Sequence, residues 1–176
     1  MDGSFGRNEG PEWVLQKFEK VLSAAARATQ QIPDELIDWT SPERGRVLRQ
    51  FTFHIFDRPN TMLNAYEKGS YNAEDRGRNI TDALESRDVA DIVQYGEEVM
   101  ARIRKFFNQA TQETLEEAVD TYMGQMSVQQ LLDLGLGHSV HHLKQLYSFM
   151  VQIGITPDSP LSERDFEGVA VPTELF

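Results

Sequence analysis

His138 and His142 are the residues of this chain best suited to chemistry. They stand four apart in residues 134–146, a segment that otherwise has the composition of a buried helix. Imidazoles at positions i and i+4 share one helical face with Cβ atoms about 5–6 Å apart, so both can reach one metal ion. His54 lies in a second apolar segment, and all four histidines of the chain fall in these two segments. This distribution predicts a metal site between helices.

The spacing around the pair predicts that both rings face the interior. An inward-facing stripe with steps of three and four residues runs through Leu131, Gly135, His138, His142, Leu146, Phe149 and Ile153. A buried imidazole needs partners for its nitrogens, and serine, threonine or backbone carbonyls are one alternative. A metal ion would satisfy three rings at once, since neutral imidazole is a ligand for zinc, nickel and iron. We therefore interpret His54, His138 and His142 as metal ligands.

Three protein ligands leave one coordination position for water or substrate, as in catalytic zinc sites. The chain has no cysteine, so a fourth protein ligand would be a carboxylate or His141, and the open arrangement is preferred. Arg58, one turn after His54, is the candidate catalytic residue, because a guanidinium can clamp a carboxylate or stabilise a thiolate. Asp57 could orient a ligand histidine. For Arg58 and Asp57 alike, an ordinary surface ion pair is the alternative.

Helical periodicity dominates the chain, and strand patterns are nearly absent. The expected helices are residues 11–31, a second from an N-cap near Ser41 through Leu63, a third from Ser86 through Phe107, and a fourth from Ser127 to Ile153. Pro59 predicts a kink or a break near Arg58. Residues 66–84 are expected to form a long loop, and residues 109–125 a poorly patterned connection with one helical turn at 114–119. Four long helices with long connections predict an all-α four-helix bundle.

The expected domain organisation is a flexible N-terminus (1–10), the bundle (11–156) and an irregular C-terminal tail packed on it (157–176). Gly135 and Gly137 precede the histidine pair, although glycine in a helix costs about 1 kcal/mol relative to alanine. This cost indicates close approach of another helix or room for a ligand. A packing contact without functional meaning is the alternative.

The composition predicts a cytoplasmic protein. The net charge of −11 argues against a nucleic-acid partner, which requires clustered lysine and arginine. No apolar run approaches the roughly 18–20 residues of a membrane span, and residues 1–10 do not resemble a secretory signal. Without cysteine, the fold needs no oxidising compartment and supplies no nucleophilic thiol.

His54, followed about eighty residues later by His-x-x-His-His-x-x-Gln at 138–145, resembles the DinB-like (YfiT-type) superfamily of four-helix bundles. The resemblance covers residues 13–153. It implies a divalent metal, commonly nickel or zinc, held by His54, His138 and His142, and a homodimer. Some members are thiol transferases or isomerases that use mycothiol, bacillithiol or glutathione. Two departures are Leu143-Lys144, where the family often has Arg-Gly, and the early Pro59.

The leading hypothesis is a metal-dependent transferase that activates a low-molecular-weight thiol against a small-molecule substrate, with nickel, zinc or iron as the metal. A metal-dependent hydrolase is the first alternative, since an open site also activates water. The chain has no His-Glu-x-x-His motif to supply a general base. A non-enzymatic, metal-stabilised binding or stress protein is the second alternative. The metal, the thiol and the electrophile stay open at this point.

Overall fold

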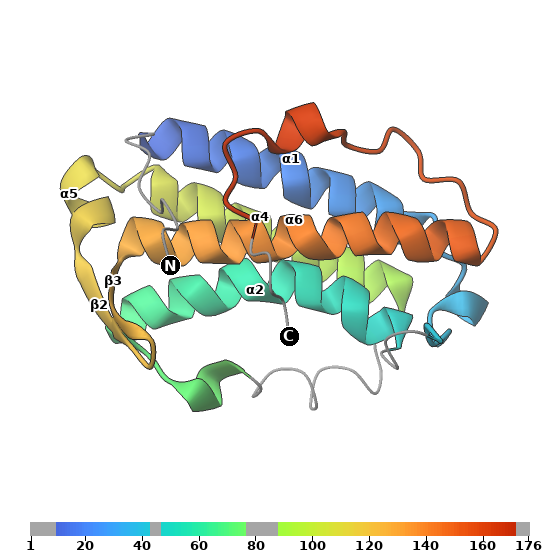
Figure 1. Cartoon of the computed structure of the whole chain (residues 1–176), viewed down its shortest axis with the longest axis horizontal. Coiled ribbons are helices and arrows are strands. Elements are labelled where there is room, and N and C mark those ends of the chain that lie inside the picture. Colours follow the sequence, from blue (N-terminus) through green and yellow to red (C-terminus); the bar gives the residue numbers. More distant parts are fainter. Residues whose placement is uncertain (1–9, 43–46, 77–87, 172–176) are drawn as a thin grey trace.

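Four long helices lie side by side in the computed structural model, which describes residues 10–42, 47–76 and 88–171 (Figure 1). These are α1 (Pro11–Gln30), α2 (Leu48–Lys68), α4 (Val89–Phe107) and α6 (Val128–Gln152). The short helix α5 (Gln112–Glu116) and three 3₁₀ turns, η1 (Asp34–Leu36), η2 (Ala73–Arg76) and η3 (Glu163–Phe166), connect or flank them. The predicted all-α four-helix bundle is confirmed.

Local capping explains where two of the helices begin. The Ser127 hydroxyl accepts a hydrogen bond from Gln130 N (3.1 Å), and the Gln130 amide oxygen accepts one from Ser127 N (2.8 Å). Asp88 likewise caps α4 by accepting from Asp91 N at 2.9 Å. The predicted start of the third helix, near Ser86, lies outside the described residues.

The predicted start of the second helix near Ser41 is wrong, since α2 begins at Leu48. The backbone before it is extended: Thr40 and Val47 form an isolated antiparallel bridge, and Leu48 N donates to Trp39 O at 2.8 Å. This pairing uses backbone groups that a helix starting at Ser41 would need for its own first turns.

A small three-stranded sheet covers one end of the bundle, beside α5 (Figure 1). The strands are β1 (Ser70–Tyr71), β2 (Ala118–Thr121) and β3 (Gly124–Ser127); β1 pairs with β2 in parallel, and β2 with β3 antiparallel. The expectation that residues 109–125 form a poorly patterned connection is therefore wrong. Residues 70–71 of the predicted loop 66–84 also form a strand. Gly124, at φ 109°, provides the left-handed residue that the β2–β3 turn requires.

The centre of α2 is buried on every side. All residues from Phe51 to Pro59 are buried, including the polar Thr52, His54, Asp57 and Arg58. A helix enclosed in this way must satisfy its polar side chains within the protein. α2 also continues unbroken through Pro59, so the alternative of a helix break is wrong.

The segment after α6 runs back along the bundle over α1 and α6 (Figure 1). Phe166 is buried, Lys17 Nζ donates to the carbonyl of Glu167 (2.9 Å), and Leu161 N donates to the Tyr147 hydroxyl (3.2 Å). The predicted flexible N-terminus lies outside the described residues except for Gly10. No helix in the described ranges combines the length and apolar character that a membrane crossing needs.

Candidate metal centre

The three predicted ligands converge in the interior, although His54 belongs to α2 and the other two to α6. Nε2 of His138 lies 2.9 Å from Nε2 of His54 and 2.9 Å from Nε2 of His142. The three rings each offer a ligand nitrogen, and these atoms lie within 4.8 Å of one another. His54 and His142 are each 6% exposed, and His138 is partly buried. The structure therefore brings together the residues that the sequence singled out.

Aromatic packing restricts the histidine rings. Phe51, one turn before His54 in α2, packs edge-on against His142 with ring centroids 4.9 Å apart. Phe51 also contacts Phe149 of α6 at 5.0 Å in the same edge-on manner. These contacts form an apolar wall that limits rotation of the His142 ring and keeps water from one side of it.

Gln145 orients His142. Its side-chain oxygen Oε1 lies 2.7 Å from Nδ1 of His142. An amide oxygen only accepts hydrogen bonds, so Nδ1 carries the ring proton and Nε2 directs its lone pair toward the other two histidines. This is the usual arrangement around a ligand histidine. Sequence reasoning recorded Gln145 only as a motif position, although its i+3 spacing from His142 could have indicated this contact.

The donor set fits a divalent cation. His138 Nε2 faces two other Nε2 atoms, and one N–H can donate to only one of them. A cation with nitrogen bonds of about 2.0–2.1 Å in tetrahedral geometry would place its nitrogen ligands roughly 3.3 Å apart. The observed 2.9 Å separations are close to that value. Imidazole nitrogens of this kind suit zinc and nickel.

Asp57 and Arg58 are both buried, so the alternative of a surface ion pair is wrong. Arg58 is 5% exposed and its Nη2 lies 3.4 Å from Oδ2 of Asp57, which is 0% exposed. Asp57 accepts hydrogen bonds from the Tyr95 hydroxyl (2.9 Å) and the Thr61 hydroxyl (3.3 Å). Asp57 thus anchors Arg58 one turn beyond His54. A role of Asp57 as acceptor for a ligand histidine stays a prediction.

The contacts of Asp57 continue into a polar layer between α2 and α4 that sequence reasoning missed. Asn60 Nδ2 donates to the Tyr95 hydroxyl at 3.0 Å, and Arg102 of α4 donates to Oδ1 of Asn60. Arg102 also pairs with Glu67 at 2.7 Å. The spacing of Asp57, Asn60 and Glu67 on α2 could have indicated a polar face. In the bundle, this face turns toward α4: Asp57 is buried, Asn60 is partly buried, and Glu67 at the end of the face is exposed.

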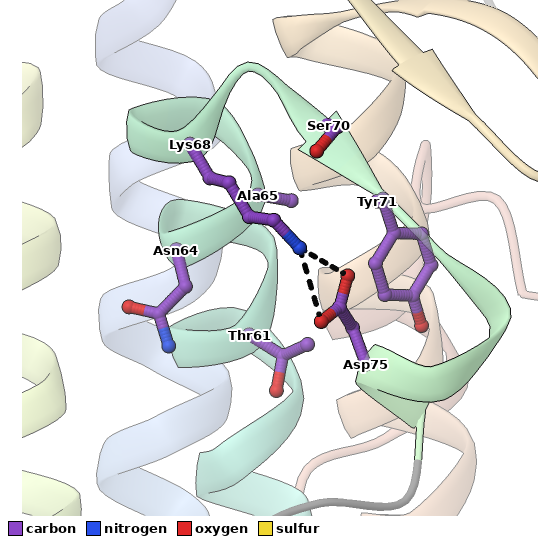
Figure 2. Close-up of a pocket in the computed structure, with 7 residues that line it drawn as sticks. All are labelled: Thr61, Asn64, Ala65, Lys68, Ser70, Tyr71 and Asp75. Carbon is purple, nitrogen blue, oxygen red and sulfur yellow. Dashed lines mark hydrogen bonds and ion pairs between the residues drawn. The ribbon is translucent and has the colours of Figure 1, made fainter.

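A small cavity of about 100 Å³ lies farther along α2 (Figure 2). Its lining residues are Thr61, Asn64, Ala65, Lys68, Ser70, Tyr71 and Asp75. The Lys68 ammonium points to the Asp75 carboxylate, with Nζ–Oδ2 at 3.1 Å, so the cavity contains a paired positive and negative charge. Thr61 links this cavity to Asp57 through its hydroxyl.

The sequence profile of the DinB family matches residues 8–166. A DinB-like protein from Bacillus cereus has a TM-score of 0.70 at 17% identity, covering 84% of this chain and 95% of its own. YfiT from Bacillus subtilis, described as a probable metal-dependent hydrolase with an unusual four-helix bundle topology, has a TM-score of 0.69 at 14% identity, covering 87% and 93%. The DinB-like protein YjoA of Bacillus subtilis has a TM-score of 0.65 at 20% identity, covering 82% of this chain and 93% of its own. None of the curated proteins matches this chain.

Proposed function

We propose, given that the chain belongs to the DinB family, that it is a metal-dependent transferase acting with a low-molecular-weight thiol. His54, His138 and His142 would hold the divalent cation, with nickel or zinc as the preferred ions. The second substrate would be a small electrophilic molecule. The observation that carries this proposal is the convergence of three Nε2 atoms from two helices on one buried point.

The make-up of the cluster supports an open coordination position. Within the described residues, the group close enough to share an ion contains three histidines and no carboxylate. Three protein ligands are typical of catalytic zinc sites, whereas structural sites close with four. His141 is not part of the group, although its ring packs edge-on against His142 at 5.2 Å.

A bound divalent cation would lower the pKa of a coordinated thiol from about 8.5 and so supply a thiolate at neutral pH. The chain has no cysteine, so the sulfur must come from the small molecule. In the transfer, sulfur forms a bond to the electrophilic carbon, the leaving group departs with its electron pair, and the thiol proton passes to solvent.

Three residues of the chain would prepare this reaction. Gln145 fixes the tautomer and orientation of His142 through its 2.7 Å contact. Phe51 shields the same ring from water. Arg58, held by Asp57, supplies a buried cation one turn from His54 and is the candidate for binding a carboxylate or stabilising a thiolate.

A metal-dependent hydrolase is the second candidate, because YfiT, with a similar fold, is described as a probable enzyme of that class. The absence of a carboxylate from the described cluster weighs against this candidate, since hydrolysis needs a general base near the water. A metal-stabilised binding protein is the third. We also propose a homodimer, which sedimentation analysis of the purified protein would test.

Turnover assays distinguish the three functions. The untagged protein, loaded with Zn²⁺ or Ni²⁺, would be incubated with 1-chloro-2,4-dinitrobenzene or monobromobimane and with mycothiol, bacillithiol or glutathione. We expect product formation above the uncatalysed rate only when metal and thiol are both present, no such increase with His138→Ala, and normal turnover with the control His141→Ala. Full turnover in metal-free protein contradicts the proposal. Ester hydrolysis without thiol favours the hydrolase, and thermal stabilisation by metal without any turnover favours the binding protein.

A further inference from the structure

Pro59 leaves a backbone carbonyl of α2 without its usual helical donor. In an α-helix the N–H of residue 59 would donate to the carbonyl of Ile55, but proline has no N–H, and its ring crowds that carbonyl. Ile55 is 0% exposed, so water does not readily replace the missing donor. A buried carbonyl of this kind needs a partner from another element.

Ser139 of α6 supplies that partner. Its hydroxyl donates to Ile55 O at 2.8 Å, and the Ser139 side chain is itself 0% exposed. The same hydroxyl lies 3.2 Å from Gly135 O, one turn earlier in its own helix. The shorter distance indicates that the proton points mainly to Ile55. A hydroxyl of α6 therefore replaces the hydrogen bond that Pro59 removes from α2.

This contact sits beside the metal centre. Ile55 directly follows His54, and Ser139 directly follows His138. The Nε2 atoms of these two histidines are 2.9 Å apart. Gly135 permits the close approach: a Cβ there would lie 3.4 Å from Cα of Pro59 and 2.9 Å from a side-chain atom of Met62. A shift of α2 along α6 would break the hydrogen bond from Ser139 to Ile55 O and, at the same time, move His54 away from His138.

We infer that Ser139 is a positioning residue of the metal centre, and that its bond to the Ile55 carbonyl fixes the register of α2 against α6. The inference rests on the proposed metal binding by His54, His138 and His142. On this inference Pro59 also contributes to the register of the two helices. Because Pro59 removes the donor within α2, the Ile55 carbonyl depends on the other ligand-bearing helix for its hydrogen bond.

A double-mutant cycle tests this coupling with Zn²⁺ alone, titrated in competition with a fluorescent chelator. Ser139→Ala should weaken Zn²⁺ binding about 10–100-fold, the range seen when residues supporting metal ligands are removed. Pro59→Ala restores an N–H for Ile55 O. In the Pro59→Ala background, Ser139→Ala should change the Zn²⁺ affinity less than about threefold, because the Ile55 carbonyl then no longer depends on Ser139. Ser148→Ala, at an exposed serine of α6, is the matched control and should change nothing.

Visible absorption of the Co²⁺-loaded protein gives a second readout. The Co²⁺ bands should shift in Ser139→Ala and return to the wild-type spectrum in the double variant, with all proteins measured below their melting temperatures. A Ser139→Ala protein that melts earlier but keeps wild-type affinity and spectrum overturns the inference while leaving the proposed function intact. Equal losses of affinity in both backgrounds also overturn it.

Two further outcomes are decisive. If Ser139→Ala does not fold, the double variant should still fold and bind Zn²⁺; a double variant that fails to do so overturns the inference. A wild-type protein that binds no Zn²⁺ or Co²⁺ overturns both the inference and the proposed function, and this result is recognised without any variant.

Discussion

The α1–α4 interface and the α2–α6 interface are built from different kinds of residue. Between α1 and α4 the buried residues are almost entirely hydrophobic, with Phe18 and Phe107 in ring contact at 6.4 Å. Between α2 and α6 the buried set includes His54, His142 and Ser139, together with Pro59 and a close-packed glycine. The first interface gains its stability from apolar area, whereas the second adds individual polar contacts to its apolar packing.

This difference implies that stability and metal binding can be separated by mutation. Substitutions in the α1–α4 half should lower the free energy of unfolding and leave the histidine geometry intact. Substitutions in the α2–α6 half should affect metal affinity more than their cost in stability would suggest.

The largest expected effect on stability comes from Phe18→Ala. Phe18 is 0% exposed, and its truncation should lower the free energy of unfolding by about 3–5 kcal/mol. Urea unfolding measures this loss, with Val151→Ala, at a 65% exposed position, as a control near zero. Zn²⁺ affinity of the folded variant should match wild type. A comparable fall in affinity would show that the two halves are not separable.

A pair of glycines gives the next largest effect. A Cβ at Gly96 of α4 would lie 2.7–2.9 Å from three ring atoms of the buried Phe56 of α2, a contact outside the α2–α6 interface, so Gly96→Ala should cost about 1–2 kcal/mol after the gain in helix propensity. Gly135→Ala meets the more flexible Met62 first and should cost less stability, yet it should weaken Zn²⁺ binding more. The same weakening in both variants would contradict the comparison.

The smallest expected effect concerns Asp133 of α6. Burial raises the pKa of Asp133 to about 6, above its unfolded value near 3.9. The folded protein therefore binds more protons than the unfolded chain between these values, and stability falls as the pH rises through that window. Because Asp133 is partly exposed, the loss should be about 1 kcal/mol. In metal-free protein, Asp133→Asn should abolish this component of the pH dependence; unchanged pH dependence in the variant would exclude Asp133 as its source.

The sequence was sufficient to predict the long helices and the inward direction of His138 and His142. Both follow from spacings of three and four residues, which put side chains on one helical face. The convergence of His54 with them was inferred from residue type and context, because no spacing relates two separate helices. The structure brings all three rings together.

Three features could not be predicted in this way. The strands β1 to β3 are four residues or shorter, too short for an alternating pattern to mark them, and β1 pairs with β2 across a long stretch of chain. The contacts of Asp57 with Tyr95 are hidden because charged residues are normally assigned to the surface. Pro59 indicated a perturbed helix, but the donor that compensates for it, Ser139, lies on another helix.

Metal analysis of protein purified without an affinity tag tests the central claim most directly. Wild-type protein should contain about one divalent ion per chain, and His138→Ala should contain almost none while keeping its helical circular dichroism. A wild-type protein that retains no more nickel, zinc or iron than His138→Ala, even after incubation with each ion, would contradict the account.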